Sequence, residues 1–140
     1  MYRFSRPRPD GWEGRLVAYI EANSQSKFAW GKWDCGEFAA GAIDVMRCIR
    51  IDRSVLATAR GSIGFRSRRK PGQFREIVSI VCPMVEVPGA MRQRGDIVLL
   101  QSDIGFALGL VDPRHSRIAA LSRSGIIYVL NPRVVCAWRA

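Results

Sequence analysis

The sequence predicts an α+β fold, in which helices come first and an antiparallel sheet of short strands follows. Before Cys48, apolar residues recur at the spacing of amphipathic helices. After Pro88-Gly89, five short apolar or β-branched runs are separated by turn residues. Because the strands follow the helices instead of alternating with them, the order is typical of α+β proteins.

The length of 140 residues predicts one domain over residues 1–140, with a basic amino-terminal arm at 1–10. An apolar fraction of 48% is enough for one core without metal or disulfide staples. No apolar run reaches the ~18 residues of a membrane span. The arm is basic and proline-rich, without the apolar stretch of a secretory signal.

The first helix is expected to begin at Asp10-Gly11-Trp12-Glu13, with Asp10 as its cap and Glu13 closing a capping box. Its apolar face follows at helical spacing and stops at Asn23-Ser24. The residues of this face are Trp12, Leu16, Tyr19 and Ile20.

The second helix follows an aromatic segment, residues 28–33, which is too irregular to be helical. Asp34-Cys35-Gly36-Glu37 repeats the capping pattern, with Asp34 as the cap and Glu37 as its reciprocal partner. The helix should run to about Cys48. Its apolar face contains Phe38, Ala39, Ala42, Ile43 and Met46, and the small residues Gly36, Ala39, Ala40 and Gly41 would let another element approach closely.

The sequence signals for secondary structure are weak between residues 51 and 83 and become regular again after Pro88-Gly89. We expect a short helix at 54–60, a glycine-containing loop and a further helix at 74–81 that is ended by Pro83. Strands are expected at 97–100, 106–111, 117–121, 126–130 and 134–138, as an antiparallel meander or small barrel.

The net charge of +10, from 22 Lys+Arg against 12 Asp+Glu, predicts attraction to an acidic partner. Nucleic acid, an anionic surface and an acidic protein all fit. The one basic cluster is a solvated loop or a docking patch, and it lacks the interleaved aromatic residues of a single-strand binder. It consists of Arg66, Arg68, Arg69 and Lys70.

The four cysteines, Cys35, Cys48, Cys82 and Cys136, form no CxxC pair. We expect four buried thiols instead of disulfides. An iron–sulfur or metal site that uses all four stays open as an alternative, although the close ligand pairs of such sites are absent. No cofactor and no metal are expected.

Cys35 is the sharpest candidate for chemistry. The first turn of a helix favours an anion, so a thiolate would be stabilised there, as in several cysteine nucleophiles. The alternative is a small buried hydrophobic residue. The neighbouring Trp30, Trp33 and Asp34 are candidate binding residues, although tryptophans also serve as core anchors. Asp96 is expected to form a turn by bonding to the backbone instead of acting as an acid.

Three pieces of the sequence together resemble a known family. Phe28-Ala29-Trp30-Gly31, Asp34-Cys35-Gly36-Glu37-Phe38 and Arg94-Gly95-Asp96-Ile97-Val98 look like the landmarks of the NlpC family of bacterial and phage cell-wall peptidases. The likeness is greatest to short phage tail proteins of that pattern, including Arg6-Pro7 and Trp12 near the start. It implies a papain-like fold in which Cys35 holds the position of the nucleophile.

The same resemblance implies that the catalytic base is lost. Laying Leu108-Gly109-Leu110 on the family's Val-Gly-Ile puts Ala107 where the family has histidine. The residue that orients this histidine would fall near Ala119 or Ala120, and Phe28 stands where the family has tyrosine. An alanine has no atom to accept a proton. His115, the only histidine, is expected in a turn at the opposite end of the strand.

The resemblance therefore implies a structural or assembly protein of a phage or prophage-derived tail, at the tail tip, with a degenerate peptidase fold. Such a protein would be made in the bacterial cytoplasm, would reside in the virion, and would contact hub or distal tail proteins, with DNA or acidic protein surfaces as further partners. One alternative is an active cell-wall amidase or endopeptidase that uses Cys35. Another is a nucleic-acid-binding module, which the charge alone supports.

Overall fold

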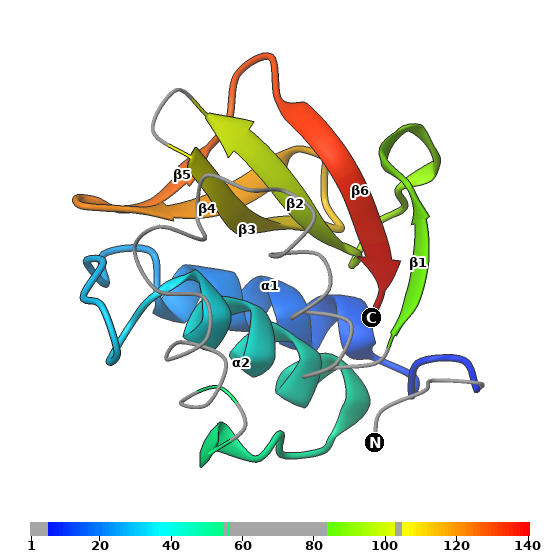
Figure 1. The fold of residues 1–140 in the computed structure, drawn as a ribbon. Helices are drawn as coiled ribbons and strands as arrows, with labels where there is room; N and C mark the ends of the chain where they lie inside the picture. Colours follow the sequence, from blue (N-terminus) through cyan, green and yellow to red (C-terminus); the bar gives the residue numbers. More distant parts are fainter. Residues whose placement is uncertain (1–5, 55, 57–83, 103–104) are drawn as a thin grey trace.

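In the part of the chain that the structure describes, helices α1 (Trp12–Ala22) and α2 (Cys35–Arg47) pack on one side of a six-stranded antiparallel sheet (Figure 1). The computed structural model describes residues 6–54, 56, 84–102 and 105–140. The sheet contains β1 (Val85–Pro88), β2 (Ile97–Ser102), β3 (Gly105–Val111), β4 (Ile118–Ser122), β5 (Gly125–Tyr128) and β6 (Arg133–Arg139), and the 3-10 helix η1 (Gly89–Met91) follows β1. The predicted α+β class is confirmed.

The strand order is β1-β6-β2-β3-β4-β5. Strands β2 to β5 form the expected meander, and β6 returns to pair with β2 on its other side. All five predicted strands are confirmed, with ends that shift by one or two residues. The edge strand β1 and η1 were not predicted, because β1 is short, largely exposed and ends in a proline, without the alternation that marks a strand.

Alternation along the strands divides the apolar residues between the two faces of the sheet. The helix-side face carries Ile97, Leu99, Leu108, Leu110 and Trp138, which pack with Leu16, Phe38, Ile43 and Met46 of the helices. The opposite face carries a second cluster of Val98, Leu100, Val111, Ile118, Ala120 and Ala137. A register shift between Leu99 and Leu100 marks a β-bulge in the pairing of β2 with β6.

The residue that caps α1 differs from the predicted one. The residue that caps α1 is Gly11, in a left-handed conformation with φ of 80°, and no side chain caps the helix. The predicted Asp10 cap with its Glu13 capping box is therefore wrong. Glycine adopts this conformation without steric cost, and the Asp10 carbonyl accepts a hydrogen bond from Arg15 Nη1 at 2.8 Å. The predicted end at Asn23 is confirmed.

The start of α2 follows the prediction more closely. Asp34 Oδ1 accepts a hydrogen bond from the Glu37 amide at 3.0 Å, so Asp34 is the cap. The Glu37 carboxylate forms an ion pair with Arg53, with Oε2 at 3.0 Å from Nε. The five predicted apolar positions of α2 are all buried. The helix ends at Arg47, one residue before the left-handed Cys48.

Gly41 of α2 lies directly against Tyr19 of α1. A Cβ atom at this position would overlap the hydroxyl of Tyr19 on α1, and this hydroxyl donates a hydrogen bond to the Phe38 carbonyl at 2.9 Å. We predict that Gly41→Ala lowers the free energy of unfolding by about 1–3 kcal/mol, because the added methyl group forces the helices apart. Urea denaturation measures the change.

Gly14, on the exposed side of α1, provides the matched control. Its Cβ would meet no heavy atom within 4 Å. Because alanine has the higher helix propensity, Gly14→Ala should leave the protein unchanged or up to about 1 kcal/mol more stable. Equal unfolding free energies for the two variants would contradict a close contact at Gly41.

Several predicted features lie outside the described residues. These are the helix at 74–81, the preceding loop, the basic cluster Arg66, Arg68, Arg69 and Lys70, the cysteine Cys82, and most of the helix at 54–60. Among the helices that the structure describes, none has the length and apolar character needed to cross a membrane.

Candidate functional site

Asp34 holds the aromatic loop against the start of α2. Within the loop, Ala29 and Trp33 exchange two backbone hydrogen bonds of 2.8 Å. Asp34 is only 1% exposed, and its Oδ2 accepts a hydrogen bond from the Gly31 amide at 3.0 Å while Oδ1 caps the helix. The carboxylate therefore joins the loop to α2. This buried position serves the architecture and leaves little carboxylate surface for a ligand.

The two tryptophans of this loop have different surroundings. Trp30 is 48% exposed. Trp33 is half-buried, and its ring lies 6.4 Å from the ring of Tyr19 and 6.1 Å from that of Phe38. Trp33 thus packs at the border of the core, which leaves Trp30 as the candidate binding residue of the loop with the larger exposed surface.

Cys35 is the first residue of α2, as predicted. It is half-buried and packs against the helix-side core. Cys35, Cys48 and Cys136 are thiols, without disulfides. The expectation of buried thiols is confirmed for Cys136, only partly met by the half-buried Cys35, and wrong for Cys48, which is exposed and follows the last turn of α2.

The start of β3 lies at the same end of the sheet as the loop before Cys35. The Phe28 amide donates a hydrogen bond to the Ser122 carbonyl at 3.0 Å, which attaches the loop to the end of β4. The antiparallel pairing of β3 with β4 runs from Val111–Ile118 to Gly109–Ala120, so the first residues of β3 lie towards the same end of the sheet as Ser122 at the end of β4. The structure therefore brings the Ala107 end of β3 to the side of the sheet that supports the loop.

The side chain of Ala107 belongs to the sheet face that points away from α2. A Cβ at Gly109, two residues along β3, would contact Ile118 and Leu100 of the opposite-face cluster. Because side chains alternate along a strand, Ala107 shares this face. Phe106 and Leu108 belong to the helix-side core instead. None of the three side chains at 106–108 has an atom that accepts a proton.

The positions expected to orient a base are also small and apolar. Ala119 is fully buried in the helix-side core, opposite Leu110, and Ala120 lies in the other cluster, opposite Gly109. Both alanines fill space between strands and neither can hydrogen-bond to an imidazole.

His115 lies in the turn between β3 and β4, as predicted. Its Nδ1 accepts a hydrogen bond from the Arg117 amide at 3.2 Å, and its Nε2 is 3.7 Å from Asp112 Oδ2. Its ring also packs edge-on against Tyr128, with centroids 4.8 Å apart. The turn follows the last residue of β3, whereas Ala107 is near the first, and the four steps from Ala107 to Val111 alone span about 13 Å in an extended strand.

Asp96 forms the predicted turn by accepting a hydrogen bond from the Gln93 amide at 2.8 Å. It also has two partners that the sequence did not reveal: Arg8 Nη2 and Arg139 Nε lie 3.4 and 3.3 Å from its Oδ1. Burial raises the pKa of Asp96, and the Gln93 amide and the two arginines offset part of this rise. Arg8 also donates from Nε to the Ala140 carbonyl at 2.7 Å, so the arm is fixed to the end of β6.

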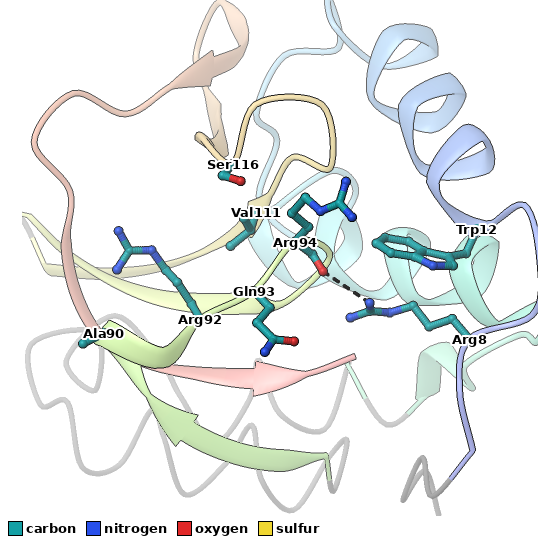
Figure 2. A pocket seen from close by; sticks show the side chains of 8 residues that line it. All are labelled: Arg8, Trp12, Ala90, Arg92, Gln93, Arg94, Val111 and Ser116. Atoms are coloured by element: carbon teal, nitrogen blue, oxygen red, sulfur yellow. Dashed lines mark hydrogen bonds between the residues drawn. The ribbon is translucent and has the colours of Figure 1, made fainter.

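A pocket of about 660 Å³ opens beside this network. Figure 2 shows Arg92 on one side of it and Arg8, Trp12 and Arg94 on the other, with Gln93 between them. The guanidinium of Arg8 covers the ring of Trp12 at 4.2 Å from its centroid. Sequence reasoning missed this pocket, since its residues come from the arm, α1, η1 and the segments around β2 and β3.

No three histidine, cysteine, aspartate or glutamate side chains gather as a possible metal site within the described residues. A family model described as "Domain of unknown function (DUF6950)" matches residues 7–140 of the chain. A comparison with curated proteins finds no match.

Proposed function

We propose a structural instead of a catalytic role for this chain, which belongs to the family described as a domain of unknown function (DUF6950). The proposed role is that of an assembly component of a phage or prophage-derived tail, at the tail tip. Two observations support it. The motifs around Cys35 resemble those of short phage tail proteins of the NlpC type. The start of strand β3 is apolar, whereas NlpC peptidases carry their catalytic base at the start of the corresponding strand.

The apolar character of residues 106–108 is the observation that carries the non-catalytic part. A cysteine at a helix start can attack a carbonyl, but the leaving amine still needs a proton from an acid. A positioned acid–base group contributes about 10²–10⁴-fold to the rate. Phe106, Ala107 and Leu108 cannot supply it whichever of them occupies the family's base position. The only imidazole, that of His115, is engaged at the other end of β3.

The arrangement of the elements supports a papain-like fold of the NlpC type as part of the proposal. A helix that begins with a cysteine packs on an antiparallel meander, and contacts of α2 with β3 and β4 place the helix over its centre. In this proposal the preserved Asp34 cap and Cys35 are architectural, since the cap holds the aromatic loop whether or not the thiol reacts.

The test of the non-catalytic role uses purified peptidoglycan fragments. They are incubated with the wild-type protein, with Cys35→Ala and with Cys48→Ala as the matched exposed-cysteine control, and released peptides are counted by chromatography and mass spectrometry. We predict the same background for all three proteins. Release by the wild type and by Cys48→Ala, lost in Cys35→Ala, would instead establish the cell-wall amidase.

The tail assignment needs a separate test. Particles are purified from the host that carries the gene, and their proteins are identified by mass spectrometry. We expect the chain in the tail fraction, in a fixed ratio to the other tail proteins, and deletion of its gene should leave defective tails. Intact, infectious tails that lack the protein would overturn the assignment.

A further inference from the structure

The pocket beside α1 carries positive charge that the described residues do not neutralise. Arg8 lines the pocket, but it is paired with Asp96, which also has Arg139 as a partner. Arg92 and Arg94 line the pocket itself, and neither has a carboxylate partner in the described parts of the chain. Two cationic side chains without a carboxylate partner among the described residues therefore line the same pocket, and Figure 2 shows their guanidinium groups on opposite sides of it.

Both arginines are held in place by the backbone. Arg92 Nη1 donates a hydrogen bond to the Gly89 carbonyl at 2.9 Å, and Arg94 Nη1 donates one to the Pro113 carbonyl at 3.1 Å. Each guanidinium has five N–H donors, so several remain for a ligand. Because their orientation is already fixed, less side-chain entropy is lost when an anion binds.

The geometry of the pocket favours carboxylates over nucleic acid. Guanidinium groups bind carboxylates through paired, charge-assisted hydrogen bonds. Among the described residues, the only aromatic ring that lines the pocket is that of Trp12, and the guanidinium of Arg8 lies over this ring, so little aromatic surface is left on which a nucleic-acid base could stack. A volume of about 660 Å³ is within the range of pockets that bind a ligand.

The surroundings also suit a peptide. Ala90, which is exposed, gives the pocket an apolar part, and the neighbouring Met91 is 63% exposed. A peptide segment can place acidic side chains on the arginines and apolar side chains on this part. An inorganic anion would use the arginines alone.

We propose that this pocket binds the carboxylate side chains of an acidic peptide segment from a partner protein. The inference deepens the proposed structural role, because it names the chemistry of the partner, and it rests on that role for the partner being a tail protein. Arg92 and Arg94 make the ion pairs, and Gln93 offers a neutral hydrogen-bonding group between them.

The test measures binding of a capped hexaglutamate peptide by isothermal titration calorimetry at low salt. The double variant Arg92→Gln/Arg94→Gln should bind at least tenfold more weakly than the wild type. The matched control is Arg117→Gln/Arg123→Gln, which removes the same charge from two exposed arginines outside the pocket and should change the affinity less than threefold. Equal losses in the two variants, or no binding by the wild type, would overturn the proposal.

Three further measurements distinguish a carboxylate site from a general anion site and from a nucleic-acid site. Arg92→Lys/Arg94→Lys keeps the charge and removes the paired geometry, so we expect an intermediate affinity, and wild-type affinity would reject bidentate recognition. Inorganic phosphate that displaces the peptide at equal concentration would indicate a simple anion site. If a duplex oligonucleotide binds more tightly than the peptide and its binding depends on the same arginines, the ligand of the pocket is nucleic acid and the peptide proposal is rejected.

A failure of the pocket proposal can be distinguished from a failure of the proposed tail function. Peptide binding is measured on the purified protein and does not depend on whether particles contain it. Binding without incorporation into tails would reject the tail role alone, whereas incorporation without peptide binding would reject the pocket.

Discussion

Replacing Asp96 by alanine is expected to lower the free energy of unfolding by about 3 kcal/mol, the lower end of the range for breaking a buried ion pair. The Asp96 side chain is fully buried and accepts hydrogen bonds from the Gln93 amide and from Arg8. Without it, this amide and the guanidinium groups of Arg8 and Arg139 lose a partner that bulk water does not replace at this site. Urea denaturation at neutral pH measures the loss.

Two further variants make this prediction specific. Asp10 is exposed, and Asp10→Ala should change the stability by less than about 0.5 kcal/mol. Arg8→Met combined with Asp96→Ala should cost less than the sum of the two single changes, because each removes a charge that the other leaves unpaired. An Asp96→Ala variant as stable as Asp10→Ala would show that the network does not hold the arm to the domain.

The sequence predicts the elements whose signals are local. The five β-branched runs were enough to locate β2 to β6, because alternation and turn residues mark a strand by itself. The cap of α1 was wrong because Gly11, with its positive φ, controls the entry to the helix, and side-chain capping chemistry cannot reveal a backbone angle. The edge strand β1 depends on pairing with β6, about 50 positions away, so the residues of β1 alone do not predict a strand.

The candidate site likewise contains features that depend on adjacent residues and features that depend on residues far apart in the sequence. The Asp34 cap, the place of Cys35 at a helix start and the turn around His115 each depend on a few adjacent residues, and the structure agrees with all three. The Arg8–Asp96 pair joins residues 88 positions apart, and no local pattern predicts it. The face of β3 on which Ala107 lies is likewise decided by the packing of Gly109 against Leu100 and Ile118.

The second large effect is expected at Asp112, which directly follows β3 and, like Asp96, has no exposed surface. Its carboxylate accepts hydrogen bonds from the Arg114 amide at 2.8 Å, from Arg114 Nη2 at 2.9 Å and from the Tyr128 hydroxyl at 2.8 Å. We predict that Asp112→Ala lowers the free energy of unfolding by about 2–3 kcal/mol at neutral pH, because these donors lose a charged acceptor. Tyr128→Phe removes one of the bonds and should cost about 1 kcal/mol.

The stability contributions of Asp96 and Asp112 should respond oppositely to pH. At Asp112, burial raises the pKa, but the hydrogen bonds from Arg114 and Tyr128 outweigh it, and the pKa lies below the usual value. Its stabilisation is therefore fully present above the unfolded-state pKa of about 3.9 and is lost as the pH falls through the folded-state pKa. At Asp96 the pKa is raised, so the favourable contribution of this shift is present below about pH 3.9 and is lost as the pH rises through the folded-state pKa.

Unfolding free energies measured from pH 2 to pH 7 separate the two residues. Asp112→Asn should flatten the acid limb of the stability curve, since the variant no longer loses an ionised acceptor on acidification. In Asp96→Asn, stability should rise more steeply with pH than in the wild type. The raised pKa of Asp96 favours the folded state at low pH, and the variant lacks this contribution. Parallel curves for the wild type and both variants would mean that neither carboxylate titrates differently in the folded and unfolded chains, and the electrostatic account of both clusters would fail.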